Sequence, residues 1–560
     1  MYVTLTHKIK AKKVKENVQF HSVNETRKMY QEIFLGLATL LVLTYFYFHQ
    51  QWKYWTKRGV FQTQPTFPFG TLGAFFTKSE AFLDFAKRQG QEAGNRPFYG
   101  GYFLLNPVLF LKDVDLVKQV TVKDFDHFVD RNSSTMKEIF FGGKTRTDDI
   151  WRKQMTSAEG DEWKNIRATF TPIFTSGKMK AMMIFIQEGC GNLFNAFDKF
   201  AANNEEFELK KCVGKFSMDT IASCAFGVDA QSFTNDNSQF VQFALNIFKQ
   251  DFQQGVLAFL AFLPLGRKIM NAFGLSVLKQ KETEFFYEAI SASLKYRRES
   301  KTKRNDLVDM MLEAIKGELS EDHNEAEADQ YEKDSKLNHK AEKHDFDELV
   351  VVATAIVILV AGYDTTGSTL AYACYYLAKH PEVQDKLRNE IEDIVGDDPE
   401  KMTKFSYDDI QQMHYLDAVI SETLRCYNPV PNLQRTCTKD YQIPGTDIVI
   451  PKGGEVWINV PSIHQDPKHY DSPLEFNPEN FSKENKAKRN PYAFLPFGQG
   501  PRNCIGMRFA LLEAKCALAT IVKNFTLLPS SKTKEPIEID PISAITYPKY
   551  GLYAKVERRN

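Results

Sequence analysis

The chain has 560 residues, of which 43% are hydrophobic and 25% charged, a composition typical of a globular protein. Its 71 Lys and Arg balance its 71 Asp and Glu, so the sequence lacks the overall basic charge that favours nucleic-acid binding. The eight cysteines form no Cys-x-x-Cys pair, which argues against zinc-ribbon and thioredoxin-like sites. So few cysteines in so long a chain also argue against a disulfide framework.

The first feature along the chain is an apolar segment near the N-terminus. Residues 33–52 contain no Asp, Glu, Lys or Arg, and about 20 residues of helix cross a hydrocarbon core of about 30 Å. Residues 29–52 are therefore predicted to form a transmembrane anchor. A cleaved signal peptide is the alternative, but no small-residue cleavage site follows the apolar run. Aromatic residues typical of a membrane interface gather at its end: Tyr45, Tyr47, Trp52, Tyr54 and Trp55.

Basic residues flank this segment on both sides and give conflicting orientations. Lys53, Lys57 and Arg58 follow it and would hold that side in the cytosol, but a longer basic stretch precedes it within residues 1–28. Translation from Met29 would remove the conflict. Residues 1–28 are thus either a basic extension or a stretch that is not translated. A mitochondrial presequence is the least favoured reading, because a long apolar segment follows.

The rest of the chain is predicted to be a short linker and one large domain. Residues 53–70 contain Pro65, Pro68 and Gly70 and are predicted to be a stiff, non-helical linker, with the large domain at 71–560. Most of the region 80–425 has the pattern of helices separated by short polar turns, and β-type segments fall near 102–105 and 448–458. The predicted fold class is mainly α with small β-sheets.

Two segments inside this domain stand out by composition. Residues 317–345 are polar and of mixed charge, so they are predicted to form a surface loop. The apolar run Leu349–Gly362 is too short to span a bilayer. Its β-branched residues would also suit a buried strand, but its apolar character continues to Ala378, before His380-Pro381, which favours one long buried helix.

The strongest chemical signal is the segment Phe497–Gly506, FGQGPRNCIG. It places Cys504 just before an apolar helical stretch, whose positive dipole end and free N–H groups favour a thiolate. Gly500 and Gly506 are expected to let a flat cofactor approach the backbone, and Arg502 to pair with a carboxylate of that cofactor. A lone cysteine in a loop is usually inert, but the whole decapeptide indicates a ligand.

This segment resembles the FxxGxRxCxG haem-binding signature of the cytochrome P450 family at every fixed position, Phe497 included. The resemblance implies the cytochrome P450 fold, haem b as the cofactor and Cys504 as the ligand of its iron, and thiolate ligation in that family favours O–O cleavage. It extends over about residues 33–558. It is closest to the microsomal clan that includes vertebrate drug-metabolising and insect detoxifying members.

A second motif, Glu422-Thr423-Leu424-Arg425, places an acid and a base on one helix face, where they can pair. Alone this pattern is common and usually a solvated ion pair. Among apolar neighbours and ahead of the Cys504 loop, it resembles the family's ExxR element. The family usually supplies an Arg as third partner, where this chain has Asn480, which cannot make the charged bidentate contacts of Arg.

A third motif, Ala361–Thr366, lies on the predicted long helix. Buried Asp364, Thr365 and Thr366 are costly there unless they form hydrogen bonds. The motif resembles the family's oxygen-activation element, which implies that Thr365 is the alcohol and Asp364 the acid of a catalytic proton relay. A helix bend satisfied by hydroxyl-to-carbonyl bonds is the alternative.

Further cationic and aromatic residues resemble ligands of the haem propionates. Trp163 and Arg167 match the family's WxxxR, Arg435 matches the Arg of the strand after the ExxR helix, and Arg131 is a weaker match. Each alone is more often a surface residue. A buried haem nevertheless needs cationic partners for its two carboxylates.

The resemblance implies a monooxygenase that inserts one atom of dioxygen into an apolar substrate: a xenobiotic, steroid or lipid. No flavin or nicotinamide fingerprint occurs in the sequence, so the electrons are expected from NADPH through NADPH–cytochrome P450 reductase, with cytochrome b5 as a further candidate partner. Membrane lipid is an expected partner and nucleic acid is not. The expected location is the endoplasmic reticulum membrane, with the catalytic domain on the cytosolic side. A basic docking face is expected near the Cys504 loop: Lys486, Lys488, Arg489, Arg508 and Lys515.

Two other functions are compatible with parts of the pattern. A haem-thiolate isomerase or dehydratase acting on peroxides would need no reductase, but such enzymes commonly lack the acid–alcohol pair, so Asp364 and Thr365 argue against it. A non-catalytic ligand carrier would be expected to lack Cys504.

A second membrane contact is expected at Gly255–Leu265, an apolar stretch after an amphipathic segment. In the family it resembles, this region lies over the substrate channel and touches the bilayer. A buried helix–helix contact is equally compatible. Exposure of Phe259 and Phe262 would distinguish the two, because soluble surfaces seldom carry such a patch.

Overall fold

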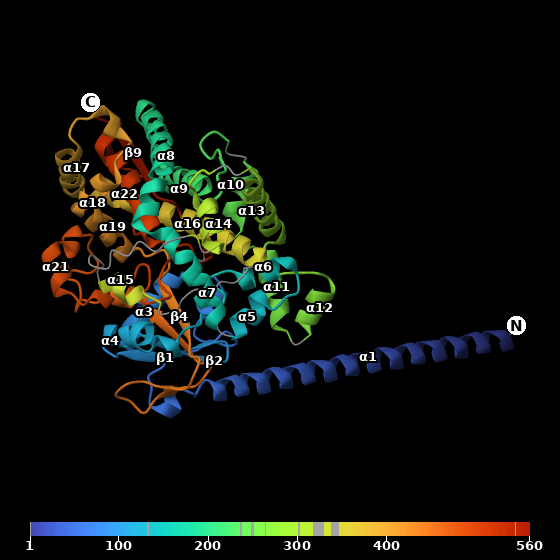
Figure 1. Ribbon diagram of the computed structural model, residues 1–560. Coiled ribbons are helices and arrows are strands. Elements are labelled where there is room, and N and C mark those ends of the chain that lie inside the picture. Colours follow the sequence, from blue (N-terminus) through green and yellow to red (C-terminus); the bar gives the residue numbers. More distant parts are fainter. Residues whose placement is uncertain are drawn as a thin grey trace.

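The computed structural model describes residues 2–559 except 132–133, 236–237, 248–250, 264, 301–302, 317, 319–329, 338–346 and 544. Helices make up most of it and three small sheets lie among them, which confirms the predicted fold class (Figure 1). The helices are α1 (Tyr2–Gln51), α2 (Gly73–Phe76), α3 (Phe82–Ala93), α4 (Val114–Lys118), α5 (Ser134–Phe141), α6 (Arg146–Lys153), α7 (Gly160–Phe170), α8 (Ser176–Ala202), α9 (Leu209–Phe226), α10 (Gln239–Asn246), α11 (Phe252–Phe262), α12 (Gly266–Ala272), α13 (Gln280–Ser300), α14 (Leu307–Ile315), α15 (Gln330–Ser335), α16 (Glu348–Lys379), α17 (Pro381–Val395), α18 (Tyr407–Gln412), α19 (His414–Cys426), α20 (Val460–His464), α21 (Lys483–Lys488) and α22 (Met507–Asn524).

The largest sheet joins the two halves of the sequence. Its strand order is β1-β2-β7-β4, and β2 pairs in parallel with β7, with Val108 opposite Glu455. The other sheets have the orders β3-β9-β8 and β5-β6. The strands are β1 (Phe98–Phe103), β2 (Asn106–Leu111), β3 (Phe207–Glu208), β4 (Asn432–Thr436), β5 (Tyr441–Gln442), β6 (Val449–Ile450), β7 (Glu455–Asn459), β8 (Phe525–Pro529) and β9 (Tyr553–Arg558).

Helix α16 is the central helix of the core. It begins where the Asp347 side chain accepts a hydrogen bond from Leu349 N, and it ends at His380, because Pro381 cannot continue it. Most of its side chains are buried, and it packs against α9 and α22. The prediction of one long buried helix is confirmed. By length and composition alone α16 could also cross a membrane, but 67% of its apolar window is buried inside the domain.

Helix α1 projects away from the rest of the molecule (Figure 1). Residues 27–58 are long and apolar enough to cross a membrane, and only 6% of that apolar window is buried. The last turn of α1 is different, since Phe48 and Trp52 are buried. Trp52 Nε1 donates to the Leu104 carbonyl at 2.9 Å, and the Tyr102 hydroxyl donates to the Trp52 carbonyl at 2.7 Å. The end of the apolar segment is therefore fastened to the first sheet.

The segment predicted as a linker also packs against this sheet. Trp55 and Val60 are buried, and Gln62 forms a bridge with Gly100 in β1. Residues 53–70 thus contribute to the core of the domain instead of running free of it. Of the polar stretch 317–345, residues 318 and 330–337 are described, and they include α15.

Helices α11 and α12 carry an apolar surface. Phe259 is 63% exposed and Phe262 46% exposed. Further exposed apolar residues lie around them: Val256, Leu263, Leu265, Ile269 and Phe273. Their exposure argues against the buried helix–helix contact at Phe259 and Phe262, and a membrane contact here stays a prediction.

Candidate active site

The Cys504 loop is held in place by its own backbone. Cys504 N donates to the Phe497 carbonyl at 2.8 Å, and Asn503 N donates to the Gly500 carbonyl at 2.9 Å. Helix α22 begins at Met507, directly after Gly506. All eight cysteines belong to the described residues, and Cys504 is exposed while the other seven are buried.

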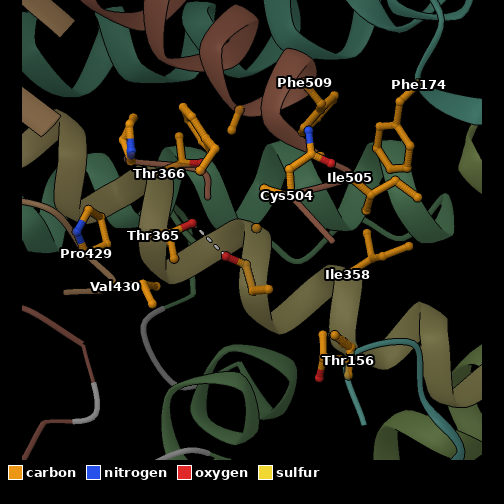
Figure 2. Close-up of a pocket in the computed structure, with 18 of the residues that line it drawn as sticks. Thr156, Phe174, Ile358, Thr365, Thr366, Pro429, Val430, Cys504, Ile505 and Phe509 are labelled. Carbon is orange, nitrogen blue, oxygen red and sulfur yellow. Dashed lines mark hydrogen bonds between the residues drawn. The ribbon is translucent and has the colours of Figure 1, made fainter. Parts of the chain in front are cut away.

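Cys504 is exposed to a cavity of about 480 Å³ between its loop and α16, a size within the range of about 300–1,000 Å³ that holds cofactors and small ligands. Figure 2 shows Cys504 facing the part of α16 that carries Thr365. Most of the lining is apolar and comes from segments far apart in the chain. Examples are Phe174, Ile358, Val430 and Phe509.

The surroundings of Cys504 have opposite effects on the pKa of its thiol. Burial raises its pKa, whereas a hydrogen bond from the Gly506 backbone and the charges of Arg167 and Arg131 lower it. The predicted backbone N–H at the start of α22 is thus present, and two cations that were not predicted for this purpose also favour the thiolate. A metal ion bound through the sulfur would favour the thiolate further.

The arginines near the loop form a cluster of positive charge. Arg167, Arg435 and Arg502 are buried and Arg131 is half-buried, and within the described residues none of them forms an ion pair with a carboxylate. Burial lowers the pKa of Arg167 to about 10 and that of Arg435 to about 9, and it also lowers those of Arg131 and Arg502. Arg435 Nε has no acceptor.

Such a cluster is costly unless anions neutralise it. Haem b carries two propionates, and its thiolate ligand supplies a third negative charge. The cluster, the apolar cavity and the cavity-facing Cys504 therefore fit haem b. Arg131 and Arg167 line the cavity and would bind the propionates, whereas Arg435 is not among the lining residues.

Arg502 also lines the cavity, so its pairing with a cofactor carboxylate stays a prediction, but it makes strong contacts within the protein as well. Its guanidinium donates to the carbonyls of Val129 at 2.8 Å and Ala158 at 2.6 Å, and it stacks 4.2 Å from the Trp163 ring. These donors are used within the protein, so Arg502 and Trp163 tie the Cys504 loop to the segment before α7. Arg167 is also attached to the loop, since it donates to the Asn503 carbonyl at 2.8 Å.

The two glycines of the motif differ as well. Gly500 has φ +75°, and a Cβ there would lie 1.8 Å from the Thr121 carbonyl oxygen, so it permits a close contact within the protein and not with a cofactor. Gly506 lines the cavity, where a Cβ would meet nothing nearer than Phe174 at 3.9 Å. Of the two, only Gly506 lines the cavity, so the predicted approach of a cofactor to the backbone stays a prediction for Gly506. Phe497 also lines the cavity.

The ExxR pair is completely buried. Arg425 donates to both carboxylate oxygens of Glu422 at 2.7 Å and to the carbonyls of Pro473 and Glu475. Asn480 Nδ2 donates to the same carboxylate at 3.1 Å, so a neutral hydrogen bond occupies the position of the family's third partner.

The acid and the alcohol of α16 point to different places. Thr365 lines the cavity, and its hydroxyl donates to the Ala361 carbonyl at 2.7 Å (Figure 2). Asp364 is not part of the lining and pairs with Lys210 of α9 at 2.5 Å. The nearly buried Lys210 also donates to Ser368 at 2.6 Å. Sequence reasoning missed Lys210, since nothing in its local pattern marks a buried cation.

The predicted basic docking face is partly neutralised. Lys486 and Lys515 both pair with Asp417, and Arg489 stacks on Tyr470 and Phe481 instead of pointing to solvent.

A cavity-facing cysteine at a helix start, under a core helix with a hydroxyl toward the same space, defines a haem-thiolate protein. Comparison with known proteins identifies the family: residues 65–556 match the cytochrome P450 family model. Cytochrome P450 6B2 of Helicoverpa armigera is 33% identical over 93% of this chain and 97% of its own length. Cytochrome P450 6a2 of Drosophila melanogaster is 33% identical over 95% and 100%. Cytochrome P450 6k1 of Blattella germanica is 32% identical over 92% and 95%.

The chain belongs to the cytochrome P450 family and is a P450 monooxygenase. The predicted resemblance to insect members is confirmed, since these relatives are insect proteins.

Proposed function

We propose that this chain is a membrane-anchored monooxygenase that oxidises apolar organic molecules with electrons from NADPH–cytochrome P450 reductase. The observation that carries the proposal is the cavity itself: Cys504 and Thr365 face one space whose remaining lining is mostly apolar. An apolar lining favours substrates such as xenobiotics, steroids or lipids, because it binds them by burying their surface.

The residues around the cavity have distinct roles in this proposal. Bound haem supplies the activation of dioxygen, and Cys504 holds its iron through the sulfur. Arg131 and Arg167 orient its carboxylates. Thr365 Oγ1, on the part of α16 that lines the cavity, holds and passes a proton, and Asp364 supplies protons to that region from its pair with Lys210. The apolar walls limit the water that competes for those protons.

We also propose the endoplasmic reticulum membrane as the location, with the catalytic domain in the cytosol. The exposed apolar surface of α1 and its aromatic end support a bilayer anchor. A cytosolic domain would have access to the reductase and to cytochrome b5, while apolar substrates concentrate in the adjacent lipid.

A test of the haem ligand is the CO difference spectrum of the reduced Cys504→Ser variant. A hydroxyl is a poor anionic ligand at neutral pH, so the thiolate-type spectrum should disappear. Cys437→Ser, a buried cysteine away from the cavity, is the matched control and should keep it. A retained spectrum in Cys504→Ser would mean that another residue binds the iron. Turnover of a lipid hydroperoxide without reductase would instead favour a peroxide isomerase or dehydratase.

A further inference from the structure

Helix α15 lies within the polar stretch predicted as a surface loop, yet it is attached to the Cys504 loop. Asn503, next to Cys504 in the chain, donates from Nδ2 to Ser335 Oγ at 2.7 Å. The Tyr492 hydroxyl donates to the Asp334 carboxylate. Just beyond the helix, Leu337 packs against the main hydrophobic core. These contacts fix α15 beside the residue that would bind iron.

The position of α15 matters for electron entry. None of its described side chains lines the cavity, whereas Cys504 faces it, so α15 covers another side of the loop. Electron transfer between proteins slows steeply with distance. A donor protein must therefore approach the surface over the Cys504 loop, and α15 already covers part of that surface.

Charge indicates that α15 and a donor would compete for the same surface. Asp334 is the acidic residue of α15 that contacts this surface, where its carboxylate accepts a hydrogen bond from the Tyr492 hydroxyl. A cation lies beside this contact, because Lys118 Nζ is 5.2 Å from the centre of the Tyr492 ring. Arg167 donates to both the backbone carbonyl and Oδ1 of Asn503. The positive charge of Lys118 would also attract an acidic surface of a donor protein.

We propose that α15 is an internal competitor of the electron-donating protein. It covers the docking surface over the Cys504 loop and must leave it before the donor can reduce the enzyme. The inference rests on the proposed dependence on a reductase. The donor would bind only those molecules in which α15 has left the surface. The contacts of Asp334 and Ser335 would therefore lower the apparent affinity for the donor.

The test measures how fast the full-length holoenzyme forms its CO complex after reduction through NADPH–cytochrome P450 reductase, at increasing reductase concentration. In the double variant Asp334→Ala/Ser335→Ala, the half-saturating reductase concentration should fall about threefold to tenfold, since ordinary hydrogen bonds contribute factors of about that size. Lys333→Ala, at an exposed position on the same helix, is the matched control and should stay within about twofold of the parent. Reduction by dithionite, which needs no docking, should be unchanged in all three proteins.

An unchanged or higher half-saturating concentration in the double variant would overturn the inference. If the double variant loses its thiolate-type CO spectrum, replacement of residues 330–337 by Gly and Ser of equal length provides the second variant, judged in the same way. If dithionite reduces every protein but the reductase reduces none, the proposed electron source fails and this inference with it. If the reductase reduces the double variant but not the parent protein, the result would support both the proposed electron source and the competition by α15.

Discussion

Gly500 offers the sharpest test of how the Cys504 loop is built. Alanine at φ +75° costs roughly 1–2 kcal/mol in backbone strain. Its methyl group would also lie 1.8 Å from the Thr121 carbonyl oxygen, so the loop must separate from the segment 119–123. Overpacking of this kind costs about 1–3 kcal/mol. We therefore expect Gly500→Ala to lower the free energy of unfolding by about 2–5 kcal/mol, a large part of the roughly 5–15 kcal/mol by which proteins are typically stable.

Gly506→Ala is the matched comparison within the same motif. Gly506 has ordinary backbone geometry, and its new methyl group would point into the cavity, 3.9 Å from Phe174. The protein itself should tolerate this change, while haem should bind less well because the methyl group takes up cofactor space. Thermal unfolding followed by circular dichroism, together with haem content per chain, separates the two effects. A Gly500→Ala enzyme with parental melting temperature and full haem content would refute the reasoning.

Three further predictions follow from the site and the surface. Thr365→Ala should keep haem and substrate binding but release at least about tenfold more hydrogen peroxide per NADPH consumed, since positioned acid–base groups contribute factors of about 10²–10⁴; unchanged coupling would remove this hydroxyl from the proton relay. Asn480→Arg should lower the melting temperature, because Arg425 already pairs with the carboxylate that Asn480 binds and Arg489 already contacts the Asn480 carbonyl, so a further guanidinium would add like charge in a buried place; a higher melting temperature would show that the charged triad is tolerated. A chain shortened to begin at Phe48, which retains the buried end of α1, should still bind lipid vesicles and be released by Phe259→Ser/Phe262→Ser; a shortened chain that never binds vesicles would exclude the second membrane contact.

Local motifs made the haem ligand and the buried ion pair predictable. The spacing of Glu422 and Arg425 places both on one helix face, and the Cys504 loop is a contiguous segment whose backbone is fixed by its own residues. Long-range contacts could not be predicted in the same way. Lys210 and Asp364 are 154 positions apart, so only the packing of α9 on α16 shows that they meet.

The contacts of Gly500 and Arg502 within the protein could not be predicted for the same physical reason. Gly500 was expected to face a cofactor, but its conformation and its contact with Thr121 depend on a segment far earlier in the chain. Arg502 was expected to bind a carboxylate, but backbone carbonyls from residues before α7 take up its donors. A residue type at a motif position predicts which interactions are possible, and the tertiary fold selects among them.

The distribution of thiols has a consequence for newly made protein. Burial raises the pKa of all seven buried cysteines, to about 12 for Cys190, Cys212 and Cys426, to about 11 for Cys437, and further for Cys224, Cys374 and Cys516. Oxidants and alkylating reagents attack thiolates that they can reach. Burial also raises the pKa of Cys504, but Cys504 is the thiol that reagents can reach, so it is their principal target until haem occupies the cavity. Bound haem is therefore expected to shield the Cys504 sulfur from oxidants. A chain whose Cys504 is oxidised before haem binds would lose its iron ligand.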